Sequence, residues 1–284
     1  FSKTVRSAGV FCRSFLKVRR NTMSVRINEI DKLMCDIAPK YLSEPWDNDG
    51  IMVCGDVEHE VKCAIVCLEI SAEAVDFAVR EGAEVIVTHH PYIFRPLKSV
   101  KGNTFSTIEK LMKNGISVLS YHTRLDKADG GVNDVLAVKL GLSDIEKYGE
   151  NDNDPMGRIG ELPEEMSADE FAEYIAETLG ADGLRYAAPK GGKAVKRVAV
   201  LGGAGKDFLA GAYAAGADAF VSGDLSHNTY LDGSEMGLVT VDAGHYATEN
   251  PITEKIAALL SEKLGVKTLV FDVKPPYVGI TCDE

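Results

Sequence analysis

The sequence lacks any apolar run long enough to cross a bilayer. Its longest interior apolar stretches are broken by Gly, Asp or His, whereas a membrane-spanning helix needs about 20 apolar residues in a row. It also lacks low-complexity segments and tandem repeats with a period of about 20 to 50 residues, which excludes solenoids and propellers. With 284 residues, 45% of them hydrophobic, the chain is predicted to form one large or two ordinary globular domains in the cytoplasm, without membrane contact.

Cysteine pairs with metal-binding or redox spacing are also missing. The six cysteines, at positions 12, 35, 54, 63, 67 and 282, include no CxxC motif and no zinc-ribbon spacing, so we expect reduced thiols. Positive charge is scarce, because 31 Lys and Arg face 43 Asp and Glu and leave a net charge of −12. A surface of this sign repels polyanions, which argues against general nucleic-acid binding.

The first 22 residues have the opposite composition. They carry six basic side chains and no acidic one, as an organellar transit peptide does. The chain starts at Phe1, however, and a second possible start follows at Met23. We therefore prefer a read-through or added extension for residues 1–22, with a transit peptide as the alternative, and leave this segment out of the predicted fold.

From Met23 onward, short β-branched runs alternate with segments of helical period, which is typical of an α/β protein. A buried strand at 62–68, a helix capped by Ser71 and a strand at 84–88 predict a βαβ unit with parallel strands. Further strands are expected at 117–121, 158–162, 184–187, 195–201, 219–222, 238–241 and 268–272, and further helices at 104–114, 133–140, from the capping box at 167–170, and at 207–215, 227–236 and 250–264.

A polar segment, Glu150 to Pro155, is the clearest break in composition and predicts a domain boundary. A second α/β unit follows it, and after residue 224 the pattern returns to that of the first part. We therefore expect two α/β domains, the second inserted between the segments of the first. Residues 23–152 and 225–284 form the first, metal-binding domain, and residues 153–224 form the inserted domain.

Histidines occur directly after predicted strands or where helices begin, the places where α/β proteins bind ligands. His89 and His90 follow the strand at 84–88. Because Pro91 favours an extended residue before it, we expect the two rings to point to opposite sides, so that the pair could serve two metal ions.

Two carboxylates accompany these histidines. Asp126 lies four residues after His122, just past another predicted strand, and can bridge two ions. His245 and Glu249 are four residues apart where a loop meets a helix, which places both on one helical face at an ordinary metal-ligand spacing.

Together the candidate ligands exceed what one tetrahedral zinc ion with an open position can use, and they fit two ions that share carboxylates. Two divalent ions and two carboxylates leave a positive excess, which predicts attraction for phosphate or another anion. Each fragment alone has an ordinary structural explanation: an HxxxE pair can be a solvated helix face, and His122 or His227 can simply hydrogen-bond. Their shared position after strands favours the metal site.

Two other motifs are excluded. Residues 202–207 read GGAGKD but lack the GxxxxGK[ST] spacing of a phosphate loop and the GxGxxG spacing of a dinucleotide site. We expect a tight strand-to-helix turn there instead. The chain contains no GxSxG nucleophile motif.

Over about residues 24–280 the chain resembles the GTP cyclohydrolase 1 type 2 homologue family. The resemblance is carried by motifs in the expected order: Trp46-Asp-Asn-Asp-Gly50, Thr88-His-His-Pro91, His122-Thr-Arg-Leu-Asp126 with Gly130, Gly131 and Asn133, Gly157-Arg-Ile-Gly-Glu-Leu162, Ser222-Gly-Asp-Leu with His227, and Asp242-Ala-Gly-His245 with Glu249. The departures are the leader and Glu69, where an Asp is expected.

The resemblance implies two-domain α/β subunits in a toroidal homohexamer, with a dinuclear metal site that faces the internal cavity. Matched position by position, the implied metal ligands are His89, His90, Asp126, His245 and Glu249. The resemblance also implies that His122 lies next to the ligands and that His227 lines the site.

Two functions remain open from the sequence. The first is a metal-dependent hydrolase that acts on a small anionic substrate, a nucleotide or a phosphoester, with His122 or His227 passing a proton. The second is a non-catalytic metal-binding ring that serves as an adaptor, metallochaperone or regulator. The expected cofactor is two divalent ions per chain, and the mixed ligands suit zinc, iron, manganese or nickel.

Overall fold

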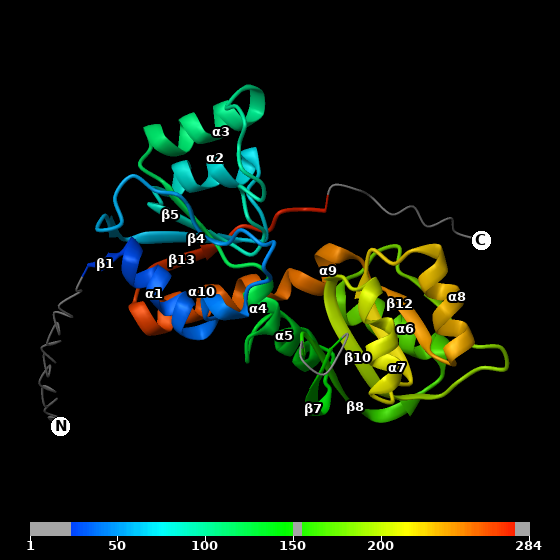
Figure 1. The fold of residues 1–284 in the computed structure, drawn as a ribbon. Helices are drawn as coiled ribbons and strands as arrows, with labels where there is room; N and C mark the ends of the chain where they lie inside the picture. The colour runs from blue at the N-terminus through cyan, green and yellow to red at the C-terminus, as the bar shows by residue number, and fades with distance from the viewer. Residues whose placement is uncertain (1–23, 150–154, 276–284) are drawn as a thin grey trace, which may run out of the picture.

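The computed structural model describes residues 24–149 and 155–275. They form two large mixed sheets that lie end to end, each with helices packed on both faces (Figure 1), so the expected α/β class is confirmed. The predicted leader and most of the boundary segment at 150–155 lie outside the described residues. Within the described ranges no helix is long and apolar enough to span a membrane.

The first sheet has five strands in the order β13-β4-β5-β6-β2. The first four run parallel and β2 is antiparallel to β6, so the βαβ unit predicted from residues 62–88 is present. The strands are β2 (Gly50–Val53), β4 (Cys63–Cys67), β5 (Val85–Thr88), β6 (Ser117–Ser120) and β13 (Lys267–Val270), with a small antiparallel pair β1 (Val25–Arg26) and β3 (Glu60–Val61) beside them.

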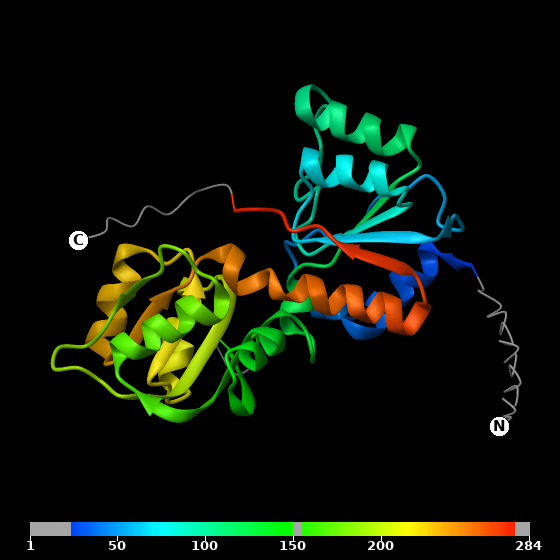
Figure 2. The ribbon, with the colours of Figure 1, turned by 180° about the vertical axis from the view of Figure 1, so that it is seen from behind.

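Helices cover both faces of this sheet (Figures 1 and 2). One face carries α1 (Ile27–Ile37) and α10 (Pro251–Leu264), and the other carries α2 (Ala72–Glu81) and α3 (Gly102–Lys113). Because side chains alternate along a strand, β4 sends Ala64 and Val66 toward the first pair and Ile65 toward the second. The full burial of β4 follows from this two-sided cover.

The second sheet has six strands in the order β7-β8-β10-β11-β12-β9. These are β7 (Ser143–Tyr148), β8 (Gly157–Met166), β9 (Arg185–Ala187), β10 (Val195–Ala204), β11 (Ala219–Gly223) and β12 (Val239–Asp242). Helices α5 (Val132–Lys139) and α6 (Ala168–Leu179) pack on one face, and α7 (Leu209–Ala214) and α8 (His227–Met236) on the other. Ser167 and Glu170 form the predicted capping box of α6.

The second sheet is longer in sequence than the expected inserted domain at 153–224. The sheet also includes β7, which precedes that range and pairs antiparallel with β8, and β12, which follows it and pairs parallel with β11. The sequence of β12, VTVD, suits a buried strand in either sheet, so its pattern could not assign it. The chain returns to the first sheet only with α10 and β13.

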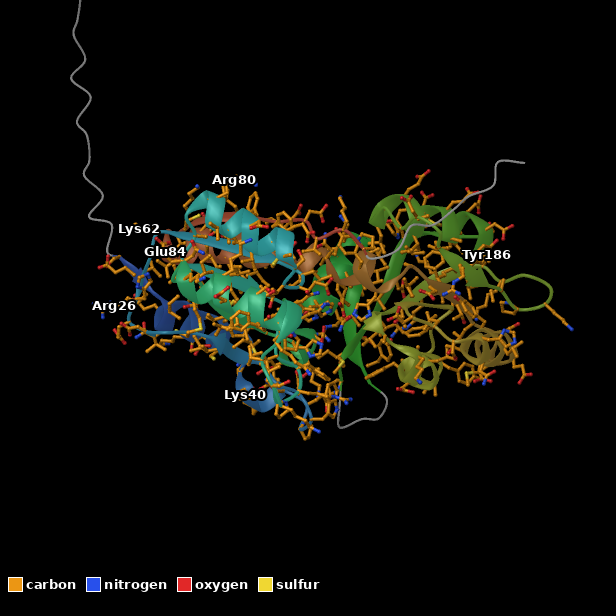
Figure 3. The ribbon with its side chains drawn as sticks, turned by 90° about the horizontal axis from the view of Figure 1, so that it is seen from above. Arg26, Lys40, Lys62, Arg80, Glu84 and Tyr186 are labelled. Carbon is orange, nitrogen blue, oxygen red and sulfur yellow. The ribbon has the colours of Figure 1, made fainter. Side chains whose placement is uncertain are left out.

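The carboxyl ends of the parallel strands in the first sheet face the second sheet. Glu84 directly precedes β5 and lies, with Lys62 and Arg80, at the end of the molecule opposite Tyr186 in β9 (Figure 3). The loops that follow β5 and β6 therefore meet α9 (His245–Glu249), which follows β12 at the junction of the two parts (Figure 1).

Candidate metal centre

His89 and His90 occupy a bend directly after β5. Their rings converge, with centroids 5.1 Å apart, and do not point to opposite sides as the extended conformation predicted. His89 is fully buried, and its Nδ1 lies 3.0 Å from the Tyr121 carbonyl oxygen. Its Nε2 faces the cluster and has no hydrogen-bond partner among the described residues.

The segment after β6 supplies His122 and Asp126. Just past β6, as the sequence predicts, Thr123–Lys127 forms a short helix, α4, with His122 just before it and Asp126 in its only turn. The Asp126 Oδ1 atom is buried and lies 3.6 Å from His89 Nε2, and no other residue that the structure describes offers it a hydrogen bond. The tight return of the chain needs Gly131, because a Cβ atom there would lie 1.9 Å from the Leu125 carbonyl oxygen.

Helix α9 supplies His245 and Glu249 from one face, four residues apart as the spacing predicts. The Glu249 carboxylate is buried and reaches ligands on both sides. Its Oε2 lies 2.8 Å from His90 Nε2 and 3.0 Å from His245 Nε2, whereas its Oε1 lies 3.7 Å from His89 Nε2. Glu249 therefore has the position of a bridging carboxylate.

Within residues 24–149 and 155–275, three groups of side chains could hold a metal ion, each with ligand atoms within 4.8 Å of one another. They are His90, His245 and Glu249; His89, Asp126 and Glu249; and His89, His90 and His122. The structure thus brings together all five expected ligands and adds His122. His227 belongs to none of these groups and is exposed at the start of α8.

A carboxylate fixes the ring orientation of three of these histidines through Nδ1. Glu69 lies 3.2 Å from His90 Nδ1, Asp224 lies 2.8 Å from His245 Nδ1, and Asp47 lies 2.9 Å from His122 Nδ1. Such partners leave Nε2 facing the cluster and raise the basicity of the ring. The sequence did not assign these roles, although Asp47 and Asp224 lie inside the motifs that carry the family resemblance.

The acid–base properties of the cluster follow from burial and these close pairs. Burial raises the pKa of the Asp126 carboxyl. Burial alone also raises that of Glu249, but the surrounding imidazoles outweigh it and hold the pKa well below its usual range. Although burial lowers the pKa of His90 and His245, their carboxylate partners raise them to about 10 and about 9. A metal ion therefore has to displace protons from these rings.

The chemistry of the donor set fits a metal ion. Within the part of the chain that the structure describes, His89 Nε2 and Asp126 Oδ1 are buried without a hydrogen-bond partner, which is costly for polar atoms unless another group satisfies them. Both point into a cluster of imidazole nitrogens and carboxylate oxygens, the ligand types of zinc, iron, manganese and nickel. The residues present can therefore hold a divalent cation.

The glycine pair at 202–203 makes room for Glu249. Gly203 has a φ of +69°, and a Cβ atom there would lie 2.2 Å from Glu249 Oε1. The Gly203 N–H donates to Thr248 Oγ1, which ties the end of β10 to α9. The pair still belongs to β10, which runs to Ala204, so the strand-to-helix turn expected at 202–207 begins only at Gly205. The two glycines form one wall of the cluster.

The charge balance differs from the positive excess predicted from the sequence. Asp126 and Glu249 lie within the cluster, and Asp47, Glu69 and Asp224 contact its imidazoles. Five carboxylates carry more negative charge than two divalent ions can neutralise. An anionic ligand would therefore need cations from outside the cluster.

Comparisons with known proteins agree with this architecture. A family model for Duf34/NIF3 (NGG1p interacting factor 3) matches residues 25–276. A Clostridium perfringens (strain 13 / Type A) protein named GTP cyclohydrolase 1 type 2 homolog is 35% identical over 245 residues, covering 84% of this chain and 93% of that protein.

Two solved structures share the fold. A hypothetical protein from Staphylococcus aureus aligns with a TM-score of 0.83 and 26% identity, covering 90% of this chain and 100% of that one. Reduced HcgD from Methanocaldococcus jannaschii aligns with a TM-score of 0.74 and 30% identity, covering 88% and 98%. The chain therefore belongs to the Duf34/NIF3 family, and the resemblance to the GTP cyclohydrolase 1 type 2 homologues is confirmed.

Proposed function

We propose that this chain binds two divalent metal ions and is a metal-dependent hydrolase of a small anionic substrate, a nucleotide or a phosphoester. The position of Glu249 carries the proposal. Its two carboxylate oxygens lie between separate ligand groups, with His90 and His245 on Oε2 and His89 nearest Oε1. A buried carboxylate shared in this way suits a pair of ions better than a single one.

Divalent ions held there would polarise a substrate oxygen and lower the pKa of a neighbouring water. The chain's own contribution is to orient the ligands and to move protons. His122 suits proton transfer because it is half-buried, borders the cluster and is held through Nδ1 by Asp47. Although burial raises the pKa of Asp47, hydrogen bonds from His122 and Thr123 lower it to about 2, so this carboxylate stays charged. We assign this role to His122 and not to the exposed His227.

The first experiment is metal analysis of protein purified without chelator or a histidine tag, beside a His89→Ala, Glu249→Ala double variant. Hydrolysis of a panel of nucleotides and phosphoesters is measured on the same samples. We expect about two ions per chain and turnover, both lost in the double variant. His59→Ala is the matched control, because His59 is exposed and belongs to none of the ligand groups.

Other results would change the proposal in defined ways. Two bound ions without turnover on any member of the panel would favour the alternative, a non-catalytic metal-binding ring that acts as an adaptor, metallochaperone or regulator. Protein that binds no metal would refute the site itself. We also propose, from the family resemblance, that the chain forms a homohexamer in the cytoplasm, which light scattering and cell fractionation would test.

A further inference from the structure

Two large aromatic side chains stand exposed beside the cluster. Trp46 is 62% exposed and Phe94 is 41% exposed. Their ring centroids are 6.0 Å apart, and each ring meets His122 edge-on, at 6.4 Å for Trp46 and 6.1 Å for Phe94. Exposed apolar surface gathered at a functional site marks a place where a ligand binds. We call this pair the aromatic wall.

The aromatic wall is held in place by the same contacts that orient His122. The Asn48 side chain donates a hydrogen bond to the Ile93 carbonyl oxygen, which ties the loop of Trp46 to the loop of Phe94. The Asn48 backbone N–H donates to Asp47 Oδ1, and this same carboxylate oxygen contacts His122 Nδ1. The wall and the cluster therefore form one connected structure, so a ring that stacks on the wall lies close to His122.

Unpaired positive charge adjoins the aromatic wall. Residues 91–101 contain Arg95, Lys98 and Lys101 and no acidic residue. All three side chains are exposed, and none forms an ion pair with another residue of the described ranges. This loop is therefore a local cationic patch on a chain whose net charge is −12.

The carboxylates of the facing loop already have partners, which are cations for Glu44 and Asp49, and His122 with Thr123 for Asp47. Glu44 pairs with Lys127, and Asp49 lies beside both Lys40 and Arg124. The cations at 95, 98 and 101 are thus available to an external anion. These cations can attract an anionic ligand, which the carboxylate-rich cluster itself would repel.

We propose that the ligand of this site is a free nucleotide, with its base packed against Trp46 and Phe94, stacked on one ring and meeting the other edge-on, and its phosphates held by Arg95 and Lys98. Aromatic rings stack on nucleobases without regard to sequence, and basic side chains bind phosphate. The inference rests on the proposed function and narrows it, because a phosphoester without a planar ring would leave the aromatic wall unused.

The chain offers a direct probe, since Trp46 is its only tryptophan. Protein with its metal as purified is titrated with GTP, ATP, guanosine and tripolyphosphate while tryptophan fluorescence is recorded. GTP and ATP are expected to quench it along a saturable curve, and tripolyphosphate is expected to compete without quenching. Phe94→Ala should weaken nucleotide binding about tenfold or more. Replacing Arg95 and Lys98 by Gln should weaken GTP binding but not guanosine binding, and added salt should reduce this difference.

Two control variants remove similar groups elsewhere. Tyr213→Ala removes an exposed aromatic ring on α7, on the outer face of the second sheet. Lys62→Gln removes an exposed cation at the remote end of the first domain (Figure 3). Both are expected to bind GTP as the parent protein does, whereas equal weakening by the site variants and their controls would overturn the proposal.

The results of these experiments distinguish the proposed nucleotide site from the proposed hydrolase activity. Quenching by GTP without turnover on the panel would support the nucleotide site and contradict the hydrolase. The protein could instead hydrolyse a phosphoester that lacks a ring, at a rate that neither GTP nor Phe94→Ala changes, and with tryptophan fluorescence that GTP leaves unchanged. This result would overturn the nucleotide site and support the hydrolase. Fluorescence that changes with protein concentration but not with nucleotide would show a second copy on the aromatic wall and would overturn the inference.

Discussion

Replacing Gly203 by alanine should disable the metal centre without touching a ligand residue. The added Cβ atom would lie 2.2 Å from Glu249 Oε1 and 3.3 Å from His245 Nε2. A carbon and an oxygen atom that are not bonded cannot stay at the shorter distance, so the Glu249 carboxylate has to leave its place between the imidazoles. The positive φ of +69° adds an independent backbone penalty of about 1–2 kcal/mol.

A matched control separates these two effects. Gly180 ends α6 with a φ of +62°, but a Cβ atom there would meet nothing within 4 Å. Gly180→Ala therefore pays the backbone penalty alone. In urea unfolding after chelation, the free energy of unfolding should fall by about 1–2 kcal/mol in both variants. It should fall further in Gly203→Ala if the clash with Glu249 is not fully relieved.

Metal affinity is the decisive measurement. Competition with a chromophoric chelator should show affinity reduced by about 100-fold or more in Gly203→Ala, since a bridging ligand is displaced. Gly180→Ala should bind metal as the parent protein does. If the two variants bind metal equally well, Glu249 is not a ligand in the position described, and the reasoning from Gly203 is refuted.

Three further predictions concern other parts of the chain. Asp224→Asn removes the charge beside His245 Nδ1 and should lower metal affinity about 10- to 100-fold in the same chelator assay; unchanged affinity would contradict an orienting role. Ser167→Ala removes the capping bond to the Glu170 N–H and should lower the free energy of unfolding by about 1 kcal/mol with metal content unchanged. Although burial raises the pKa of Asp218, two backbone N–H groups of β10 and a lysine hold it below its usual value. The stability that this carboxylate provides is therefore present above the unfolded pKa of about 4 and lost as the pH falls through the folded pKa. In denaturant titrations at several pH values, the loss of unfolding free energy caused by Asp218→Asn should become smaller in acid, and a loss that does not change with pH would refute this.

The residues of the candidate cluster could be predicted to lie close together because they follow short apolar runs that indicate strands. β5 is a continuous buried VIVT segment, and His89 comes directly after it. Parallel strands end at the same edge of a sheet, so chemistry-bearing residues after β5 and β6 had to meet. The four-residue spacing of His245 and Glu249 likewise predicted that both side chains lie on one face of a helix.

The partners of these ligands could not be predicted in the same way. Asp47 and Glu69 reach the cluster from loops whose course depends on tertiary packing, and no periodicity marks them. Strand β7 was missed because its sequence, SDIEKY, is mostly exposed and lacks an apolar run. β12 was recognised as a strand, but its pairing with β11 could not be predicted, since a strand pattern indicates burial and not the identity of the neighbouring strand.

The cluster also joins the two halves of the molecule. His89, His90 and Asp126 extend from the first sheet, whereas His245 and Glu249 follow the last strand of the second. An ion bound by both sets can keep its full coordination only while the halves stay docked, so its binding free energy is also a free energy of docking. Metal supply would then set the rigidity of the whole chain as well as the state of its site.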